Sequence, residues 1–315
     1  MKTAPVEIDL VVKRRRMAAR GVLALGLAHA DGSPLPSWAP GAHLDILLPD
    51  GMERQYSLCG DPADSGTWTI GVLREDAGRG GSAWIHDHLA EGAAVRVRGP
   101  WNHFGLVAAP SYRFVAGGIG ITPLLPMIAA AHALGATWEL DYAGRSRETM
   151  GFLDELAPYG DAVRVHAADE GSRVDLDALA PAPGELVFSC GPKRMLDSLD
   201  AAAAAWPAGT LHVERFEARD VGEPVLDEAF EVEFALSGVT VAVDPGTSIL
   251  DAAEAAGAFV LSSCREGTCG TCETVVLEGE VDHRDSILSE AERAQNDRMM
   301  VCVSRAACPR LVLEL

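Results

Sequence analysis

The sequence predicts a multi-domain α+β and α/β protein with an antiparallel β domain first, a parallel sheet covered by helices second and a small α+β domain last. Three observations support this prediction. At 315 residues the chain is about twice the usual size of one domain. Its beginning reads as short strands, its middle alternates strands with helices, and its end combines a strand hairpin with a cysteine-rich loop.

Residues 1–105 form the first predicted domain. Many short strands with glycine and proline between them indicate an antiparallel barrel or sandwich. Only residues 82–90 have a helical pattern in this region. The predicted strands are 43–48, 54–58, 67–73 and 94–98.

Residues 106–220 form the second predicted domain, in which strands and helices alternate. Such alternation is typical of a parallel sheet covered by helices. The predicted strands are 113–116, 138–143, 185–190 and 211–216, and the predicted helices are 123–134 and 193–206.

Residues 221–230 are predicted to be a linker, because they are rich in acidic residues, contain Gly222 and Pro224, and have no apolar periodicity. The third predicted domain follows at 231–315. Its strands 231–236 and 239–243 alternate on either side of a Ser-Gly turn, which indicates a hairpin, and a helix is expected at 248–256.

Composition argues against some partners. The formal net charge of -20 disfavours a nucleic-acid backbone or an anionic membrane, whereas a basic protein partner, or acidity that serves only solubility, remains open. No apolar run reaches the roughly 20 residues that a membrane span needs. The first ten residues lack the apolar core of a secretory signal. We therefore expect a soluble, cytoplasmic protein.

Four cysteines near the C-terminus have the spacing of a plant-type 2Fe-2S site, C-x4-C-x2-C followed by a distant fourth cysteine. The candidate ligands are Cys264, Cys269, Cys272 and Cys302. Gly267 and Gly270 suit a loop that bends at positive φ and brings backbone N–H groups close to sulfide. The alternative is structural zinc, but zinc loops favour two C-x2-C pairs and this sequence has one. The spacing therefore predicts a 2Fe-2S cluster.

A flavin site is indicated by two elements of the first domain. In the strand Arg54-Gln55-Tyr56-Ser57, a cation and an aromatic ring share one face. A glycine-rich turn then leads into Ser82, which as a helix N-cap would leave N–H groups and a favourable dipole facing a phosphate. Each element alone is also explained as an ordinary strand or a capped turn.

A nucleotide site is indicated by the glycine turn 117–120, which follows a predicted strand. Thr122 as N-cap and Pro123 as the first helical residue would begin the next helix. A strand, a glycine turn and a helix can place a pyrophosphate at the helix N-terminus, although the turn lacks the G-x-G-x-x-G pattern. The alternative is that these glycines only let the helix pack closely on the sheet.

The choice of nicotinamide cofactor stays open at this stage. Asp141 follows the glycine turn by one strand and can accept a hydrogen bond from a ribose hydroxyl. Arg145, Ser146 and Arg147 can instead bind a 2′-phosphate. The turn 190–192 ends another predicted strand at the sheet edge where ligands bind in open α/β folds, although a lone cysteine such as Cys190 is more often a buried small side chain.

Taken in order, these motifs resemble the phthalate dioxygenase reductase family, which includes vanillate O-demethylase reductases. They comprise Arg-x-Tyr-Ser at 54–57, Gly-Gly-Ser at 80–82, Gly-Pro-x-Asn-x-Phe at 99–104, the glycine turn through Pro123, Cys-Gly-Pro at 190–192 and the cysteine loop. The resemblance covers essentially the whole chain. It implies an antiparallel β-barrel flavin domain, a parallel-sheet nucleotide domain and a β-grasp ferredoxin domain.

The resemblance also implies the cofactors and their residues. FMN is expected, with FAD as the alternative, and NADH is favoured over NADPH. Phe216, near the end of the second domain, is expected beside the flavin. The implied flavin residues are Arg54, Gln55, Tyr56, Ser57, Gly80, Gly81 and Ser82, and the implied nicotinamide residues are Gly118, Gly120, Thr122, Asp141, Arg145, Cys190, Gly191 and Pro192.

The chemistry of the cofactors predicts the direction of electron flow. A nicotinamide gives up two electrons as hydride and a 2Fe-2S cluster accepts one, so the flavin must lie between them. The resemblance implies a Rieske-type oxygenase for aromatic hydroxylation or O-demethylation as the acceptor, docked transiently by a monomeric reductase. A cytochrome P450 acceptor is the first alternative, and a non-catalytic redox sensor is the second.

Overall fold

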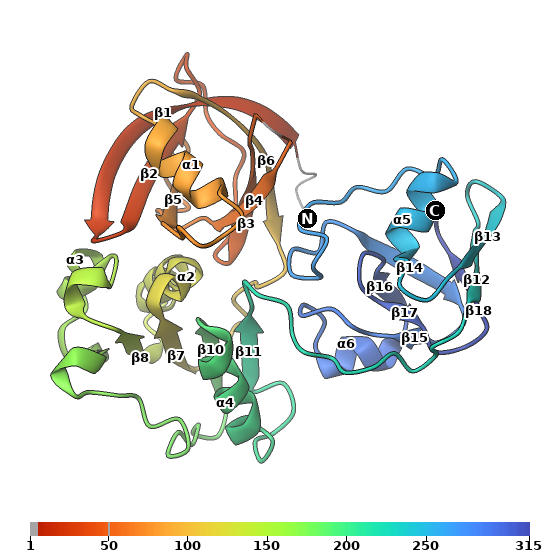
Figure 1. Ribbon diagram of the computed structural model, residues 1–315. Coiled ribbons are helices and arrows are strands. Elements are labelled where there is room, and N and C mark those ends of the chain that lie inside the picture. The colour runs from red at the N-terminus through yellow and green to blue at the C-terminus, as the bar shows by residue number, and fades with distance from the viewer. Residues whose placement is uncertain (1–5, 50) are drawn as a thin grey trace. The chain divides into compact units, whose positions relative to one another are not determined.

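The computed structural model describes residues 6–49 and 51–315. Contacts group the chain into two compact units, Met1–Glu214 and Arg215–Leu315. The first unit, red to green in Figure 1, contains two sheets, and the second, mainly blue, contains one large and one small sheet. The predicted domain boundaries at residues 105, 220 and 230 stay predictions.

The first sheet is antiparallel throughout, with the strand order β4-β3-β6-β1-β2-β5. Directly after β4, Leu58 bridges Ile70 of β5, so the two edge strands meet and the sheet closes into the predicted barrel. The elements are β1 (Val6–Ala19), β2 (Val22–Ala28), β3 (Ala42–Leu47), β4 (Glu53–Ser57), β5 (Trp68–Leu73), α1 (Gly81–His88) and β6 (Ala94–Asn102).

Strand β2 joins the barrel to the second sheet. All of its residues are buried, because alternate side chains face two different cores. Leu23, Leu25 and Leu27 lie in the barrel core, whereas Val22 and Ala24 belong to the core of the parallel sheet. Sequence reasoning predicted neither β2 nor β1.

The second sheet is parallel, as predicted, with the order β11-β10-β7-β8-β9. The order reverses between β7 and β10, so the turns after these two strands lie side by side at the switch point where such sheets bind ligands. Helix α2 lies between the barrel and this sheet (Figure 1). The elements are β7 (Ser111–Gly117), η1 (Gly118–Gly120), α2 (Ile121–Ala133), β8 (Thr137–Gly144), η2 (Arg147–Thr149), α3 (Leu153–Leu156), η3 (Ala157–Ala162), β9 (Val163–Ala167), η4 (Ala168–Glu170), β10 (Glu185–Cys190), α4 (Lys193–Ala203) and β11 (Leu211–Glu214).

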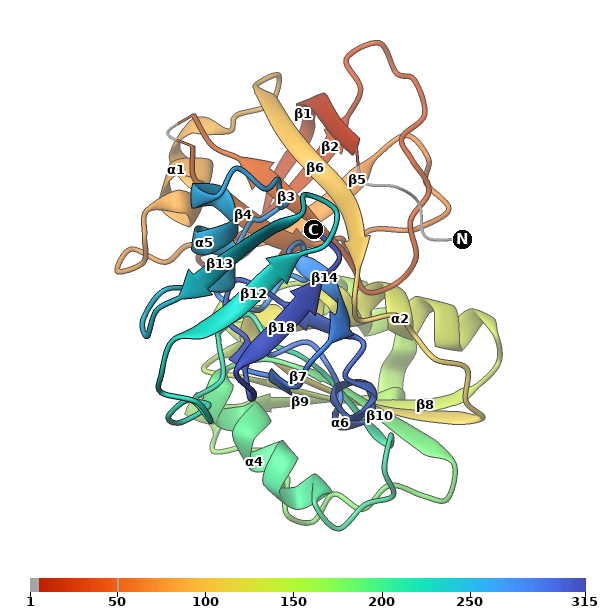
Figure 2. The same cartoon turned by 90° about the vertical axis from the view of Figure 1, so that its right-hand side faces the viewer.

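The second unit has a mixed sheet ordered β13-β12-β18-β14-β16, of which β13, β12, β18 and β14 lie side by side in Figure 2. The predicted hairpin is confirmed by the pairing of Phe234 with Val239. Buried residues of α5 pack into the core of this sheet, which gives the predicted β-grasp arrangement. The elements are β12 (Phe230–Phe234), β13 (Val239–Val243), α5 (Ile249–Ala255), β14 (Glu273–Glu278), β15 (Val281–Asp282), α6 (Glu290–Gln295), β16 (Arg298–Met300), β17 (Arg305–Ala306) and β18 (Arg310–Leu313).

The predicted linker is hydrogen-bonded to the second unit. The N–H of Val225 donates to Asp282 at 3.1 Å, and Arg284 donates to the carbonyl of Gly222. In the part of the chain that the structure describes, no helix has the length and apolar character to cross a membrane.

Candidate cofactor sites

The four predicted ligand cysteines lie together in the second unit. Cys264, Cys269 and Cys272 occupy the loop between α5 and β14, and Cys302 follows β16, the neighbour of β14 in the sheet. All four side chains are buried and none forms a disulfide. Cys264 contacts Cys269 and Cys302, and Cys302 also contacts Cys272. The fold therefore assembles the ligand set that the spacing predicts.

The arrangement of these thiols fits a two-iron cluster. Contact with Cys269 and Cys302 lowers the pKa of Cys264, and the N–H groups of Glu266 and Thr268, at 3.3 and 3.4 Å from its Sγ, act in the same direction. These contacts favour the thiolate of Cys264, the form that binds metal, whereas the same contacts raise the pKa of Cys269 and Cys302. Among the described residues, no three His, Cys, Asp or Glu side chains converge on one metal position. The four thiols contact one another in a chain from Cys269 through Cys264 and Cys302 to Cys272, a set that can hold a two-iron cluster.

The backbone of the cysteine loop has the predicted left-handed turns. Gly267 has φ +69° and Gly270 has φ +77°, as expected for a loop that bends around sulfide. Arg265 also has a positive φ of +56°, which costs a non-glycine residue roughly 1–2 kcal/mol. Its guanidinium donates to Asp251 at 2.9 Å and pairs with Glu254, both on α5, and these contacts hold the strained residue in place.

Of the predicted flavin residues, Arg54 lies at the first turn of α1. A Cβ added at Gly81 would lie 2.8 Å from Cγ of Arg54, so the Arg54 side chain crosses directly over this turn. Tyr56 is half-buried on the same strand, and burial raises its pKa. Gln55 faces β3 and donates to Asp45 at 2.8 Å. The cation and the glycine-rich turn therefore meet, while the flavin role of each residue stays a prediction.

The expectation that Ser82 caps α1 is wrong. The helix begins at Gly81, with Gly80 as N-cap at φ +89°, and no side chain caps its first turn among the described residues. The Ser82 hydroxyl instead accepts the N–H of Glu75 at 3.0 Å. Because the first-turn N–H groups have no side-chain cap, they can bind an anionic group such as a phosphate.

A buried carboxyl group that sequence reasoning missed lies beside Ser57. Glu214 ends β11 and pairs in register with Cys190, which ends β10. Burial raises the pKa of Glu214 to about 8, and the nearby Ser57 hydroxyl opposes this only in part. Ser57 Oγ and Glu214 Oε2 are both buried without a well-formed hydrogen bond among the described residues. Because these two buried polar groups lack a well-formed hydrogen bond, they indicate a site where the polar edge of a ligand could bind.

Burial also raises the pKa of Cys190 well above its ordinary value, and the Glu214 charge adds to this effect. The thiol is fully buried. This environment is that of a packed, unreactive cysteine and agrees with the absence of any predicted nucleophilic role.

The two turns of the nucleotide motif pack against each other. A Cβ added at Gly120 would lie 2.2 Å from the carbonyl oxygen of Cys190, and one at Gly191 would lie 2.9 Å from Cα of Gly117. Gly118 has φ +53°. Close packing is therefore one physical reason for these glycines, as the alternative interpretation held. This close packing places the backbone of both turns at the switch point of the sheet, where ligands bind in such folds.

The expectation that Thr122 is the N-cap of the following helix is wrong. Helix α2 begins at Ile121, and Gly120 is its N-cap. The Thr122 hydroxyl donates to the carbonyl of Ile119 at 2.9 Å. Its methyl group packs against Gly71 of β5, where an added Cβ would lie 2.7 Å away. Thr122 therefore contributes to the contact between the barrel and α2.

Asp141 lies within β8 and is bound by ion pairs. Arg164 Nε and Nη2 donate to its two carboxylate oxygens at 2.9 and 2.8 Å, and His166 Nε2 lies 2.9 Å from Oδ1. Burial alone would raise the pKa of Asp141, but these partners bring it below its ordinary value. A ribose hydroxyl would have to share this carboxylate with both partners, and the ribose role stays a prediction.

The basic residues after β8 are partly neutralised. Arg147 donates to Glu170 at 2.8 Å. Ser146 Oγ lies 3.2 Å from the hydroxyl of Thr149. Arg145 precedes them, and its carbonyl accepts the N–H of Asp169 at 3.0 Å. Phe216 lies two residues beyond β11, and its position beside the flavin stays a prediction.

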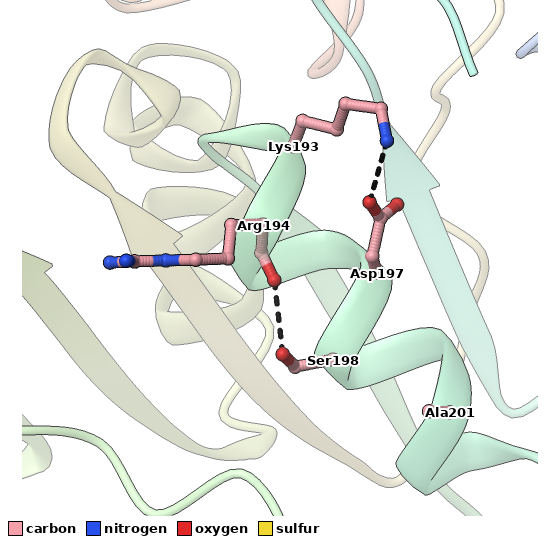
Figure 3. A pocket seen from close by; sticks show the side chains of 5 residues that line it. All are labelled: Lys193, Arg194, Asp197, Ser198 and Ala201. Atoms are coloured by element: carbon pink, nitrogen blue, oxygen red, sulfur yellow. Dashed lines mark hydrogen bonds and ion pairs between the residues drawn. The ribbon is translucent and has the colours of Figure 1, made fainter. Parts of the chain in front are cut away.

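An open pocket lies along α4, outside the predicted sites (Figure 3). Lys193 Nζ donates to Asp197 at 2.9 Å, and Ser198 Oγ donates to the carbonyl of Arg194 at 3.0 Å. The Arg194 side chain points away from both pairs in Figure 3. All lining residues come from this one helix and most are bonded to each other, so the pocket adds no ligand-binding group to the three sites.

Comparisons with known proteins agree with the cysteine site. A family model described as "2Fe-2S iron-sulfur cluster binding domain" matches residues 233–307, which contain all four cysteines. The phenoxybenzoate dioxygenase subunit beta of Ectopseudomonas oleovorans is 44% identical over 98% of this chain and 97% of its own. The phthalate dioxygenase reductase of Burkholderia cepacia is 36% identical over 99% of this chain and 100% of its own.

Several solved structures match 98% of the chain, including the following two. An intact type IV self-sufficient cytochrome P450 monooxygenase is 46% identical with a TM-score of 0.92, and this chain covers 41% of it. Phthalate dioxygenase reductase, described as modular for electron transfer from pyridine nucleotides to [2Fe-2S], is 36% identical with a TM-score of 0.70 and is 98% covered. The chain thus spans about two fifths of the P450 protein but nearly all of the reductase. With its barrel, parallel sheet and four clustered cysteines, the chain belongs to the phthalate dioxygenase reductase family of oxidoreductases, the reductase components of oxygenase systems.

Proposed function

We propose that this reductase uses bound FMN to take hydride from NADH and passes single electrons through a 2Fe-2S cluster to a Rieske-type oxygenase. The observation that carries the proposal is the nearly full-length similarity to reductase subunits of oxygenase systems. These relatives are named for phenoxybenzoate, toluene-4-sulfonate and phthalate, which supports an aromatic substrate for the partner. A reducing cytoplasm fits a chain without disulfides among its described residues, and we propose that the reductase is a monomer.

The chain's residues would bind the flavin and keep its reactive edge in place. A bound flavin supplies the conversion between a two-electron hydride and single electrons. Arg54 and the uncapped first turn of α1 would bind its phosphate, and Tyr56 would pack against its ring. Glu214, protonated below about pH 8, would hold a proton next to the Ser57 hydroxyl at the ring edge.

The nicotinamide would bind where the order of the parallel sheet reverses. The backbone of the turns at Gly120 and Gly191 approaches closely there, so a pyrophosphate can reach N–H groups without meeting a side chain. NADH is favoured over NADPH by the resemblance to the family, and of the two arginines that could bind a 2′-phosphate, Arg147 is already paired with Glu170. A 2′-phosphate would need a cation without such a partner.

A cytochrome P450 acceptor is the second candidate. It is supported by the 46% identity and TM-score of 0.92 to the P450 monooxygenase chain. The same three redox sites would serve either acceptor, because the substrate site belongs to the partner. The choice therefore depends on the surface around the cluster and on the partner that fits it.

Two measurements on the purified protein test the proposal. Assays for iron, acid-labile sulfide and flavin should give a two-iron cluster and one FMN per chain. The loaded protein should reduce cytochrome c faster with NADH than with NADPH, and failure to turn over would contradict the reductase function. Rapid reduction of an isolated Rieske oxygenase, and slow reduction of an isolated P450, would establish the acceptor; the reverse order would favour the second candidate.

A further inference from the structure

The second unit contains a single histidine, His283, and it is buried. Its side chain is 8% exposed, and its Nδ1 lies 3.8 Å from Oδ2 of Asp285, whose side chain is fully buried. Among the described residues, neither ring nitrogen of His283 has a hydrogen-bond partner. Asp285 Oδ2 has none either. An imidazole and a carboxylate are thus buried together with polar atoms that form no hydrogen bond. Such burial costs free energy of folding and therefore calls for an explanation.

The segment that carries this pair supports both parts of the cysteine site. The N–H of Ser286 donates to the carbonyl of Gly267 at 2.8 Å, and Gly267 lies between two of the ligand cysteines. The N–H of Arg284 donates to Ser304 Oγ at 3.1 Å, two residues beyond the fourth ligand. A Cβ added at Gly267 would lie 3.1 Å from Cα of Asp285. His283 is therefore held within a few residues of both ligand segments.

The groups around His283 oppose one another. Burial, the largest influence, and the Arg293 charge lower its pKa, whereas the Asp285 and Asp282 charges and the Arg293 backbone raise it, so that the net pKa lies below the ordinary value. Arg293 reaches from α6, donates to the carbonyl of Asp285 at 2.6 Å and lies 3.8 Å from its carboxylate. Asp285 Oδ1 accepts two backbone N–H groups, from residues 287 and 288, at 2.9 and 2.7 Å. The imidazole is therefore neutral near neutral pH. It lies close to the Asp285 carboxylate, whose negative charge favours its protonation.

We propose that His283 is a redox-linked proton site, which takes up one proton from water when the cluster takes up one electron. The electron is supplied by the reductase's own donor, and the products are the reduced cluster and the imidazolium. The added negative charge favours protonation because charges interact strongly in a poorly hydrated interior. Linkage is reciprocal, so protonation of His283 makes the cluster easier to reduce. The inference rests on the cluster that this family binds and is independent of the acceptor.

An EPR-monitored redox titration of the full-length holoprotein, repeated between about pH 5 and 9 where histidine titrates, tests this directly. The cluster potential should fall as pH rises within one window and should be level on either side of it. His283→Gln should give a pH-independent potential, whereas His29→Gln, in the first unit, should keep the wild-type slope. A level wild-type potential across the range, or a slope that persists in His283→Gln, would overturn the proposal.

Two further variants separate a proton site from a purely structural contact. Asp285→Asn removes a charge that raises the His283 pKa and should move the window to lower pH. Arg293→Gln removes a charge that lowers it and should move the window to higher pH. Because a loosened loop would not produce opposite displacements, this pair decides the question even if His283→Gln fails to assemble its cluster. Displacement of both windows in the same direction would contradict the proposal.

Discussion

The two units build their cofactor sites by different physical means. In the second unit, four buried thiols from one loop and one neighbouring strand end contact each other, so the site depends on the side chains that are present. In the first unit, the nucleotide turns and the first turn of α1 depend on side chains that are missing, since Gly81, Gly120 and Gly191 allow their neighbours to approach. The cluster site should therefore be sensitive to ligand chemistry, and the other sites to small increases in volume.

The largest effect should come from Cys272→Ser, which removes a cluster ligand. Reduction of cytochrome c with NADH should fall by more than about a hundredfold, beyond the cost of losing an outer-shell partner. Cys308→Ser is the matched control, because Cys308 lies in the same unit but is half-exposed and binds Glu280 and Arg310 backbone groups. Its activity should stay within twofold of wild type; comparable losses in both variants would show that the thiols are not distinguished by ligation.

Gly120→Ala should have the next largest effect, because its Cβ would lie 2.2 Å from the Cys190 carbonyl oxygen. We expect a loss of about 3 kcal/mol in the free energy of unfolding, the upper end for overpacking. Gly135→Ala is the control, since Gly135 has φ +70° but open space around it, and it should cost only about 1 kcal/mol. Gly120 itself has an ordinary φ of -62°, so equal losses in denaturant unfolding would contradict a requirement for glycine set by close packing.

Glu214→Gln should change how stability depends on pH. The folded pKa of about 8 lies above the ordinary 4.5, so between these values the folded state keeps a proton that the unfolded state has released. Stability of the wild type should therefore fall as pH rises from about 4.5 to about 8 and become level above that. In thermal unfolding measured across this pH range, the stability of Glu214→Gln should not show this decline. If the stability of both proteins fell in parallel with pH, the raised pKa of Glu214 would be disproved.

The smallest effect should come from Gly81→Ala. The new methyl group would lie 2.8 Å from Arg54 Cγ and displace a flexible side chain, not backbone. We expect flavin affinity to weaken by about 1 kcal/mol, roughly fivefold, in fluorescence titration of the flavin-free protein. Gly78→Ala, whose Cβ would make ordinary contacts at 3.4 Å, should bind flavin as wild type does. If Gly81→Ala bound flavin with unchanged affinity, the proposal that Arg54 binds the flavin phosphate would be contradicted.

The spacing predicted that four cysteines would come together, and the structure brings them together with Gly267 and Gly270 at positive φ, while their role as cluster ligands stays a prediction. The sequence also predicted the alternation of the parallel sheet, which follows from hydrophobic periodicity. The two cap assignments, Ser82 and Thr122, were wrong because a helix that starts one or two residues earlier moves the cap to a glycine. Helix boundaries depend on tertiary contacts that periodicity does not contain.

Glu214 shows what could not be predicted. It stands in the polar run Glu-Arg-Phe-Glu, which reads as a surface segment, and its burial depends on β4 of the distant barrel. Strand β1 was missed for a related reason, since the exposed basic run 13–16 interrupts its apolar pattern. In both cases the missing information is the pairing of segments far apart in the chain. Only the position of Glu214 at the carboxyl end of a strand offered a signal.

The central claim is that electrons from NADH reach the cluster only through the flavin. The most direct test is anaerobic rapid mixing of the holoprotein with NADH, with flavin and cluster reduction followed separately, beside the same protein depleted of flavin. We predict that flavin reduction precedes cluster reduction and that the cluster of the depleted protein stays oxidised. Reduction of that cluster by NADH at the holoprotein's rate would contradict the account.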